Sequence, residues 1–246
     1  MTHELALLAA TAAGIGFLHA LLGPDHYLPF VLMGRAARWS RPKTLTITFV
    51  CGLGHVGSSL ALAGLGVALG LASARLAAIE SFREQLAVWA LIAFGLVYFV
   101  WGLRRAARRR PHAHPHAHSD GTVHFHEHIH EAEHLHVHPV KHEHPHAAGA
   151  KITRLTPWIL FTLFIFGPCE PLIPLVLVPA AEQSVAGVAL VAAVFSVATL
   201  ATMLAAVAVL QAGVERLPLG PLERYTHALA GAALALCGVA LQVFRL

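Results

Sequence analysis

The chain has 246 residues, of which 57% are hydrophobic and only 12% are charged. Because an ordinary soluble domain carries roughly 25% charged residues, a soluble protein of this size could not bury so much apolar surface. The formal net charge of +4 comes from Arg and Lys in loops, which indicates membrane orientation rather than binding of nucleic acid.

Long apolar stretches dominate the sequence. Runs of about 18 or more apolar residues are typical of membrane-spanning helices. The start of the chain lacks the positively charged region of a cleaved signal peptide, so we expect it to stay in the mature protein. We therefore predict an all-α membrane protein with six transmembrane helices. The six stretches lie near residues 4–33, 45–71, 85–103, 155–180, 185–212 and 226–244.

The first stretch is too long for one straight crossing, and it contains ionisable groups in the segment LHALLGPDHYLPF. Pro24 lacks a backbone N–H, so it either kinks a helix or begins a new one. His19 then lies in the last turn before the Gly23-Pro24 break, while Asp25 and His26 follow it. Each ionisable group costs about 2.5–3.5 kcal/mol at the membrane centre, and such groups require a partner. We therefore expect a functional site at this break.

Basic residues gather in two of the expected loops. Short loops rich in Lys and Arg stay in the cytoplasm, so we predict that both termini lie outside it and that the long central loop lies inside. The loop expected near residues 75–84 balances its charges and gives no such signal. The basic residues are Arg35, Arg38, Arg41 and Lys43 in the first loop, and Arg104, Arg105, Arg108, Arg109 and Arg110 in the second.

Residues 105–152 form the expected cytoplasmic loop, in which histidine alternates with other residues over long stretches. Such a composition cannot bury a core, so we expect the segment to be disordered. Neutral imidazole binds Zn, Cu, Ni and Co, which predicts a metal-collecting loop; the alternative is a flexible linker of biased composition. Its fourteen histidines are His112, His114, His116, His118, His124, His126, His128, His130, His134, His136, His138, His142, His144 and His146.

The two halves of the chain contain an internal repeat. GPDHYLPFVLMGRAA (residues 23–37) aligns with GPCEPLIPLVLVPAA (residues 167–181). Because each half has an odd number of spans, the halves must have opposite orientations, as in the inverted repeats of secondary transporters. We predict a first three-helix transmembrane repeat at residues 1–104 and a second at residues 153–246.

The second span carries a polar pair, His55 and Ser58. The two residues are three positions apart and therefore lie on one face of a helix. The repeat pairs them with Thr199 and Thr202 in the fifth span. We expect His55 to be a metal ligand; the alternative is a hydrogen bond between helices.

The polar groups at the two breaks and in the second span predict one metal site. A mixture of nitrogen, oxygen and sulfur ligands suits a borderline divalent transition metal better than Ca or Mg. We expect the three histidines to coordinate, with Asp25 either coordinating or orienting an imidazole, and Cys169 either a ligand or a small apolar filler. The candidate ligands are His19, Asp25, His26, His55, Cys169 and Glu170. Supporting polar groups are Ser58, Ser59, Thr199 and Thr202.

The motifs GFLHALLGPDHYLPFVLMGRA, CGLGHVGSSL, FIFGPCEPLIPL and VFSVATLATML resemble those of the nickel/cobalt efflux (NicO-type) and urease-accessory UreH-like membrane proteins. The resemblance covers the two membrane halves. It implies about six transmembrane helices and transport of Ni or Co, and the His-rich loop is similar to that of nickel/cobalt exporters. The related nickel permeases carry His, four residues, then Asp-His, whereas five residues separate His19 from Asp25 here.

Together these features predict a secondary transporter of divalent transition metals in a bacterial-type inner membrane, and not an enzyme. Ni or Co is the expected substrate, Zn is also compatible, and no organic cofactor is expected. The expected partners are the metal ion, the lipid bilayer and a cytoplasmic metallochaperone, without nucleic acid. Export is favoured over uptake. The sequence has no Walker-type phosphate loop, so it does not bind ATP through that motif. We therefore expect an ion gradient or the metal's own gradient to drive transport. For a proton antiport cycle, Asp25 and Glu170 are the natural proton carriers.

Two other classes of protein share parts of this pattern. GPCEPLIP resembles the Pro-Cys-x-x-Pro element of membrane thiol-redox proteins. That chemistry needs two cysteines with Cα atoms within about 7 Å, yet the repeat places Asp25 opposite Cys169. A sulfite-type anion exporter would use the N-termini of the half-helices, but carboxylates and imidazoles at both breaks oppose it.

Overall fold

The computed structural model describes residues 3–70, 73–108, 112–117, 123–128, 148–167, 169, 171–181 and 184–244. In chain order the elements are α1 (His3–Leu22), the 3₁₀ helix η1 (Pro24–His26), α2 (Leu28–Ala36), α3 (Arg41–Ala68), α4 (Ser73–Arg108), β1 (His112–Ala117), β2 (Val123–His128), α5 (Ala148–Phe166), α6 (Leu172–Ala181), α7 (Val185–Glu215), the 3₁₀ helix η2 (Gly220–Tyr225) and α8 (Thr226–Phe244). This largely helical architecture is compatible with the predicted all-α membrane protein.

Five of the described helices are long and apolar enough to cross a membrane. They expose large apolar side chains such as Phe82, Val97 and Val209, which lipid accommodates and water does not. The described chain is therefore compatible with an integral membrane protein. The stretch expected near residues 155–180 is divided between α5 and α6, and a total of six spans stays a prediction. The five helices are His3–Leu22, Arg41–Ala68, Ala74–Ala107, Val185–Glu215 and Gly220–Phe244.

The predicted break in the first stretch is confirmed. Helix α1 ends at Leu22, Gly23 has extended backbone (φ −84°, ψ 96°), and Pro24 begins η1. In the second half α5 ends at Phe166 and α6 begins at Leu172, so this apolar stretch is also interrupted. Irregular backbone at membrane depth is tolerated only where it is buried in protein or lines a cavity, so both breaks mark internal positions.

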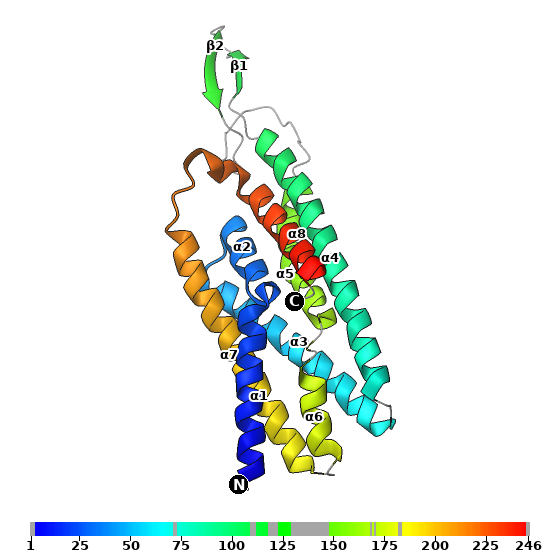
Figure 1. Cartoon of the computed structure of the whole chain (residues 1–246). Coiled ribbons are helices and arrows are strands. Elements are labelled where there is room, and N and C mark those ends of the chain that lie inside the picture. Colours follow the sequence, from blue (N-terminus) through cyan, green and yellow to red (C-terminus); the bar gives the residue numbers. More distant parts are fainter. Residues whose placement is uncertain are drawn as a thin grey trace.

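Figure 1 shows how the helices pair and in which direction they run. α1 rises from the end at which the N-terminus lies, α3 descends and α4 rises again; α5 and α6 descend, α7 rises and α8 descends. α1 packs along α7, α3 along α5, and α4 along α8. Each of these three pairs combines a helix of the first half with a helix of the second.

Helix α4 is longer than the sequence predicted. The expected span covered residues 85–103, with a loop near residues 75–84, but the helix runs over Ser73–Arg108. The expectation of a loop was therefore wrong. The physical reason is that Glu80 and Arg83, one helical turn apart, form an ion pair at 2.9 Å within the helix, so neither charge requires a loop in water.

Close packing of α4 against α8 depends on glycine. A Cβ atom placed on Gly95 would lie 2.8 Å from Cα of Ala235, and one on Gly231 would lie 2.7 Å from the carbonyl oxygen of Gly95. No side chain fits at such distances, so these positions require the bare backbone. Small residues are the usual means by which membrane helices approach closely, and this interface ties the two halves together.

The segment 105–152 contains a short antiparallel pair of strands. His112 lies opposite His128, His114 opposite His126, and His116 opposite His124. Helix α4 enters the segment at one end and α5 at the other, so its expected limits and its disorder stay predictions. The remaining histidines of the expected metal-collecting loop, which are His118, His130, His134, His136, His138, His142, His144 and His146, lie outside the described residues.

The buried apolar residues form two clusters. One includes Phe30, Met33 and Tyr98, and the other includes Val56 and Phe195. Helix α3 contributes to both, since Cys51 belongs to the first cluster and Val56 to the second. His55 therefore lies where the two apolar clusters meet.

Candidate metal centre

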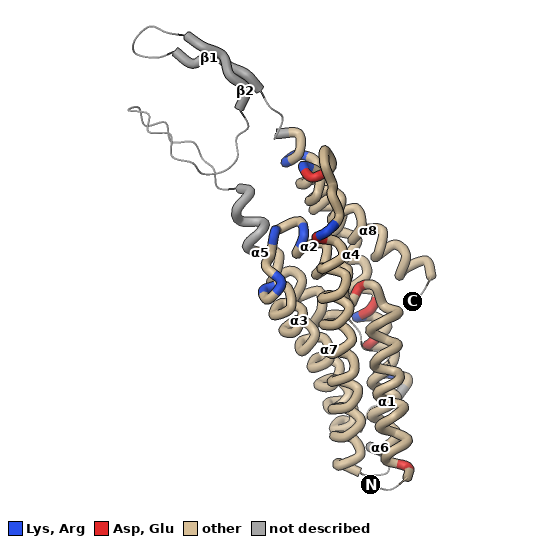
Figure 2. Tube along the Cα trace, turned by 90° about the vertical axis from the view of Figure 1, so that its left-hand side faces the viewer, with Lys and Arg blue, Asp and Glu red and all other residues tan. Residues whose placement is uncertain are grey.

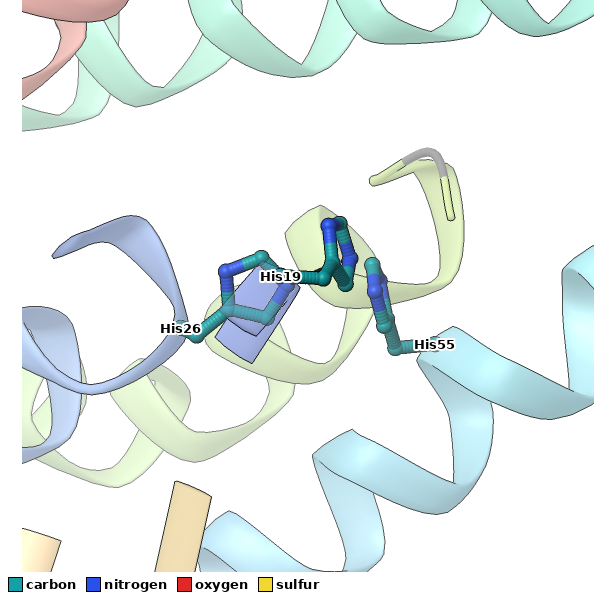
Figure 3. A group of neighbouring side chains, drawn as sticks. All are labelled: His19, His26 and His55. Atoms are coloured by element: carbon teal, nitrogen blue, oxygen red, sulfur yellow. Dashed lines mark hydrogen bonds between the residues drawn. The ribbon is translucent and has the colours of Figure 1, made fainter. Parts of the chain in front are cut away.

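Three histidines that the sequence indicated as metal ligands lie together in the structure. His19 comes from the last turn of α1, His26 from η1 and His55 from α3. Their ligand nitrogens all lie within 4.8 Å of one another, and Figure 3 shows the three imidazole rings gathered at one point. The helix break positions the first two, because the end of α1 at Leu22 allows η1 to place His26 beside His19.

The ring nitrogens of His19 and His26 have a separation that suits a shared metal ion. Nε2 of His19 and Nε2 of His26 are 3.2 Å apart. Two nitrogens bound to one metal at about 2.1 Å, at roughly octahedral or tetrahedral angles, would lie about 3.0–3.4 Å apart. The ring centroid of His55 lies 5.0 Å from that of His26 and 6.0 Å from that of His19. The ligand nitrogen of His55 lies within 4.8 Å of those of the other two histidines, so the three rings are close enough to form a three-nitrogen site.

Asp25 contacts the far side of the His26 ring. Its Oδ1 lies 3.2 Å from Nδ1 of His26, and the carbonyl oxygen of Gly23 lies at 3.2 Å from the same nitrogen. Because both partners accept, Nδ1 carries the proton and Nε2 keeps its lone pair towards His19. A carboxylate in this position fixes the tautomer of a ligand histidine and raises its basicity. Of the two expected roles of Asp25, this geometry favours orienting an imidazole.

Gly23 is required by the same arrangement. A Cβ atom at this position would lie 2.9 Å from Oδ1 of Asp25 and 2.9 Å from Cε1 of His26, with Nδ1 closer still. Any side chain would therefore displace the imidazole or its carboxylate. The glycine of the break thus leaves the space that the His26–Asp25 pair occupies.

His55 is buried, with 3% of its surface exposed. Neither of its ring nitrogens has a hydrogen-bond partner of acceptable geometry among the described residues. The backbone of Phe164 in α5 nevertheless lies close enough to interact with the ring, so the alternative in which His55 bonds two helices together stays open beside the metal-ligand interpretation. Leaving a buried polar group unpaired costs about 1–3 kcal/mol, and a bound cation would offset this cost by using the free lone pair.

Cys169 lies against the histidines from the second helix break. Its Sγ is 3.6 Å from Nε2 of His19, and its backbone N–H donates to Oγ of Ser59 at 3.2 Å. Both residues are fully buried. The contact is compatible with a sulfur ligand and equally with a small apolar filler, so both interpretations stay open. Glu170, the other candidate at this break, lies outside the described residues.

The remaining polar candidates support the site to different degrees. Oγ of Ser58 donates to the carbonyl of His55 at 2.9 Å. Oγ1 of Thr199 donates at 3.4 Å to the carbonyl of Gly16, one turn before His19, and so joins α7 to α1. Thr202 bonds the carbonyl of Ala198 in its own helix, and this bond does not connect it to the histidines.

Sequence reasoning missed an ion pair beside the site. Arg83 and Glu80 of α4 have side chains that are only 14% and 2% exposed. Arg83 also donates to Oγ of Ser58 and to the carbonyl of Ile165, both at 2.8 Å. It therefore links α4 to the His55 turn of α3 and to the last turn of α5. The i,i+3 spacing of Glu80 and Arg83 is the signal that could have revealed it.

The histidines open into a cavity of about 420 Å³. Its polar lining comes from His19, His26, His55, Asp25 and Glu84, and the other walls are mostly apolar. A water molecule takes about 30 Å³ in the liquid, so the space accommodates an ion with part of its hydration shell. The apolar walls leave the imidazoles and carboxylates as the groups that would attract a cation.

Comparisons with family models, with curated protein sequences and with solved structures found no match. The chain is compatible with an integral membrane protein, and three histidines within it form a group able to hold a metal ion.

Proposed function

We propose that this protein is a secondary transporter of divalent transition-metal cations, with Ni²⁺ or Co²⁺ as the first candidates. The observation that carries the proposal is the convergence of three imidazoles at a helix break, beside a cavity inside an apolar bundle. Ionisable side chains in membrane helices are costly and usually mark the path of an ion or substrate.

The donor atoms favour this class of cation. Imidazole suits Zn, Cu, Fe and Ni, whereas Ca and Mg prefer carboxylate, carbonyl and water oxygens. The three imidazoles outnumber the nearby carboxylate of Asp25, which is already bonded to His26. We place Ni²⁺ and Co²⁺ first because of the motif resemblance, and Zn²⁺ is compatible with the same nitrogens.

The helix break supports binding as well as positioning. The C-terminal end of α1 carries partial negative charge from its unpaired carbonyl groups, and His19 lies in this last turn. Discontinuous helices of this kind form the ion sites of many secondary transporters. A cation at the histidines would therefore meet the lone pairs of the imidazoles and the negative end of a helix dipole.

The helix arrangement supports two inverted repeats. The first-half elements α1, α3 and α4 run opposite to their proposed counterparts α5, α7 and α8 (Figure 1). A two-fold axis that exchanges the halves would also exchange the α1–α7 contact with the α5–α3 contact, and both are present. Rocking of one repeat against the other would expose the histidine site alternately to each side of the membrane.

We infer the direction of transport from the charge distribution together with the position of the His-rich loop. Lys and Arg gather at one end of the bundle (Figure 2), which we assign to the cytoplasmic side of an inner membrane, with both termini outside. The His-rich loop would then collect metal in the cytoplasm and deliver it for export. Protons would drive the cycle through Asp25 and Glu170, and a cytoplasmic metallochaperone would supply the ion.

The cysteines favour a transporter over a thiol-redox protein. All three cysteines are free and buried. Cys51 and Cys237 belong to one apolar cluster and Cys169 to the other. A redox pair would require two of them to approach within bonding distance of each other, whereas Cys169 contacts a histidine.

Metal uptake into proteoliposomes tests the proposal. The wild-type protein should transport Ni²⁺ or Co²⁺, and His26→Ala should abolish the flux. His3→Ala is the matched control, since this exposed histidine lies at the far end of α1 and its loss should leave the flux unchanged. Equal flux through His26→Ala and wild type would reject the proposed site.

Two further variants test the accompanying roles. Deletion of residues 112–146 should lower the apparent affinity and leave the maximal flux largely intact if the loop only collects metal. Asp25→Asn should abolish proton-coupled flux, because the neutral amide cannot carry a proton through the cycle. Undiminished coupling in this variant would reject the proton-carrying role of Asp25.

A further inference from the structure

A second cavity lies away from the histidine site, where several helices end. It has a volume of about 540 Å³ and is lined by residues from α2, the segment before α3, and parts of α4, α7, η2 and α8. Its charged lining consists of four arginines and two glutamates, which are Arg35, Arg38, Arg105, Arg224, Glu215 and Glu223. Figure 2 shows a cluster of Lys and Arg residues at the end of the bundle where α2 ends.

Contacts within this basic cavity leave it with an excess of positive charge. Glu215 is held by Arg41, which does not line the cavity, with Nη2 at 2.6 Å from its Oε2. Arg35 donates to the backbone carbonyls of Glu215 and Leu217, both at 3.2 Å. These carbonyls are uncharged, so the two bonds orient the guanidinium of Arg35 without neutralising it.

Two arginines stand at the edges of the basic cavity. Arg224 is exposed, and its guanidinium lies 4.7 Å from the ring centre of Tyr225. Arg38 pairs with Glu223 at 3.4 Å, but its side chain is 81% exposed, so water screens this pair strongly. Both guanidinium groups are therefore accessible to an anion that enters the cavity.

The backbone of Arg38 adds an independent observation. Its φ is +52°, in the left-handed region that glycine adopts easily and other residues rarely do. The position follows the end of α2, where the N–H of Trp39 bonds the carbonyl of Gly34 at 2.8 Å, and glycine is the usual residue there. A non-glycine residue in this conformation makes Arg38 a position at which replacement by glycine removes the side chain without straining the backbone.

The basic cavity lies at the level expected for lipid headgroups. Helix α3 begins at Arg41, α7 ends at Glu215 and α8 begins at Thr226, and these three helices are candidate membrane spans. The ends of spans lie at the interface between hydrocarbon and water. Trp39, which is buried in the apolar core, also lines the cavity.

We propose that this basic cavity binds a phosphate-bearing anion, supplied by the headgroup of an anionic membrane lipid. The guanidinium fork matches phosphate oxygens in a bidentate geometry. Basic pockets between membrane helices bind anionic headgroups in this way. The bound headgroup would hold α2 in contact with α7 and α8. Helix α2 directly follows η1, which carries His26.

Thermal unfolding of the full-length protein, purified in neutral detergent and stripped of lipid, tests the proposal. Phosphatidylglycerol should raise the midpoint of unfolding in a saturable manner. Phosphatidylcholine with the same acyl chains should raise it little, since its choline offsets the phosphate charge. A separate titration with inorganic phosphate distinguishes the sources: a saturable rise with phosphate alone would assign the cavity to a free anion instead of a lipid and overturn the lipid part of the proposal.

Two variants show whether the effect comes from this cavity. Arg38→Gly relieves the backbone strain, so the variant should fold at least as well as wild type, yet its apparent affinity for phosphatidylglycerol should fall by about tenfold. Arg224→Gln should have a similar effect. The matched control is Arg75→Gln, an exposed arginine near the start of α4, which should bind the lipid as wild type does.

The results that would overturn the proposal are equally specific. They are equal shifts with the anionic and the zwitterionic lipid, no shift with any of the three probes, or lipid binding in Arg38→Gly and Arg224→Gln that equals that of Arg75→Gln. Transport of metal is not measured in this experiment, so its outcome is independent of the proposed function.

Discussion

Replacement of His55 by leucine separates a ligand histidine from a structural one. The imidazole is buried, and neither ring nitrogen has a hydrogen-bond partner of acceptable geometry among the described residues. An unpaired buried polar group costs about 1–3 kcal/mol. Leucine has a similar size and no polar atoms, so His55→Leu should raise the free energy of unfolding in metal-free buffer by about 1–2 kcal/mol.

His227 gives the matched comparison. It is also a buried histidine in a candidate membrane span, but its Nδ1 lies 2.7 Å from the hydroxyl of Tyr98. His227→Leu breaks this bond and leaves the tyrosine hydroxyl buried, so it should lower the free energy of unfolding by about 1–3 kcal/mol. The two substitutions are chemically identical and are expected to have opposite signs.

Chemical denaturation in detergent micelles, with and without Co²⁺, measures both effects. At a metal concentration of about 100 times Kd, the wild-type protein should gain about 2.7 kcal/mol, and His55→Leu should lose most of this gain. His227→Leu should keep it. If His55→Leu destabilised the metal-free protein as much as His227→Leu does, His55 would be a structural residue and the reasoning from its unpaired nitrogens would be wrong.

Three further predictions concern the groups around the histidines. Gly23→Ala should weaken metal binding at least about tenfold by displacing the His26 ring, measured by calorimetry, whereas Gly14→Ala, where an added Cβ meets nothing within 4 Å, should not. Arg83→Gln should destabilise the fold by about 3–5 kcal/mol because it removes the opposite charge from the buried carboxylate of Glu80; a change under about 1 kcal/mol in a denaturation experiment would contradict this. Metal binding to the centre should release protons and weaken as the pH is lowered, because only neutral imidazole coordinates; a pH-independent affinity in the protein that lacks residues 112–146 would exclude the imidazoles as ligands.

Much of the histidine site could be predicted from the sequence, because local chemistry determines it. A Gly-Pro pair inside a long apolar stretch requires a helix break, and the structure has one at Gly23. The costs of burying His19, His26 and His55 in a membrane imply that these groups find one another. They do so from α1, from the 3₁₀ helix η1 that follows it, and from α3.

The surroundings of the site could not be predicted in the same way. The sequence around Glu80 and Arg83 looked like a loop because its charges balance, but the balance arises from an ion pair inside α4. The contact of Arg83 with the last turn of α5 joins residues 82 positions apart, and no local pattern indicates such a pairing. The strained backbone of Arg38 likewise depends on how α2 ends against its neighbours.

X-ray absorption by one equivalent of bound Co²⁺ tests the central claim most directly. The measurement uses the protein that lacks residues 112–146, because this deletion removes the loop histidines that would also bind the ion. The account predicts a spectrum with about three imidazole nitrogens at roughly 2.0–2.1 Å, and about two in the His55→Leu variant. A spectrum dominated by oxygen ligands, or one that His55→Leu leaves unchanged, would contradict it.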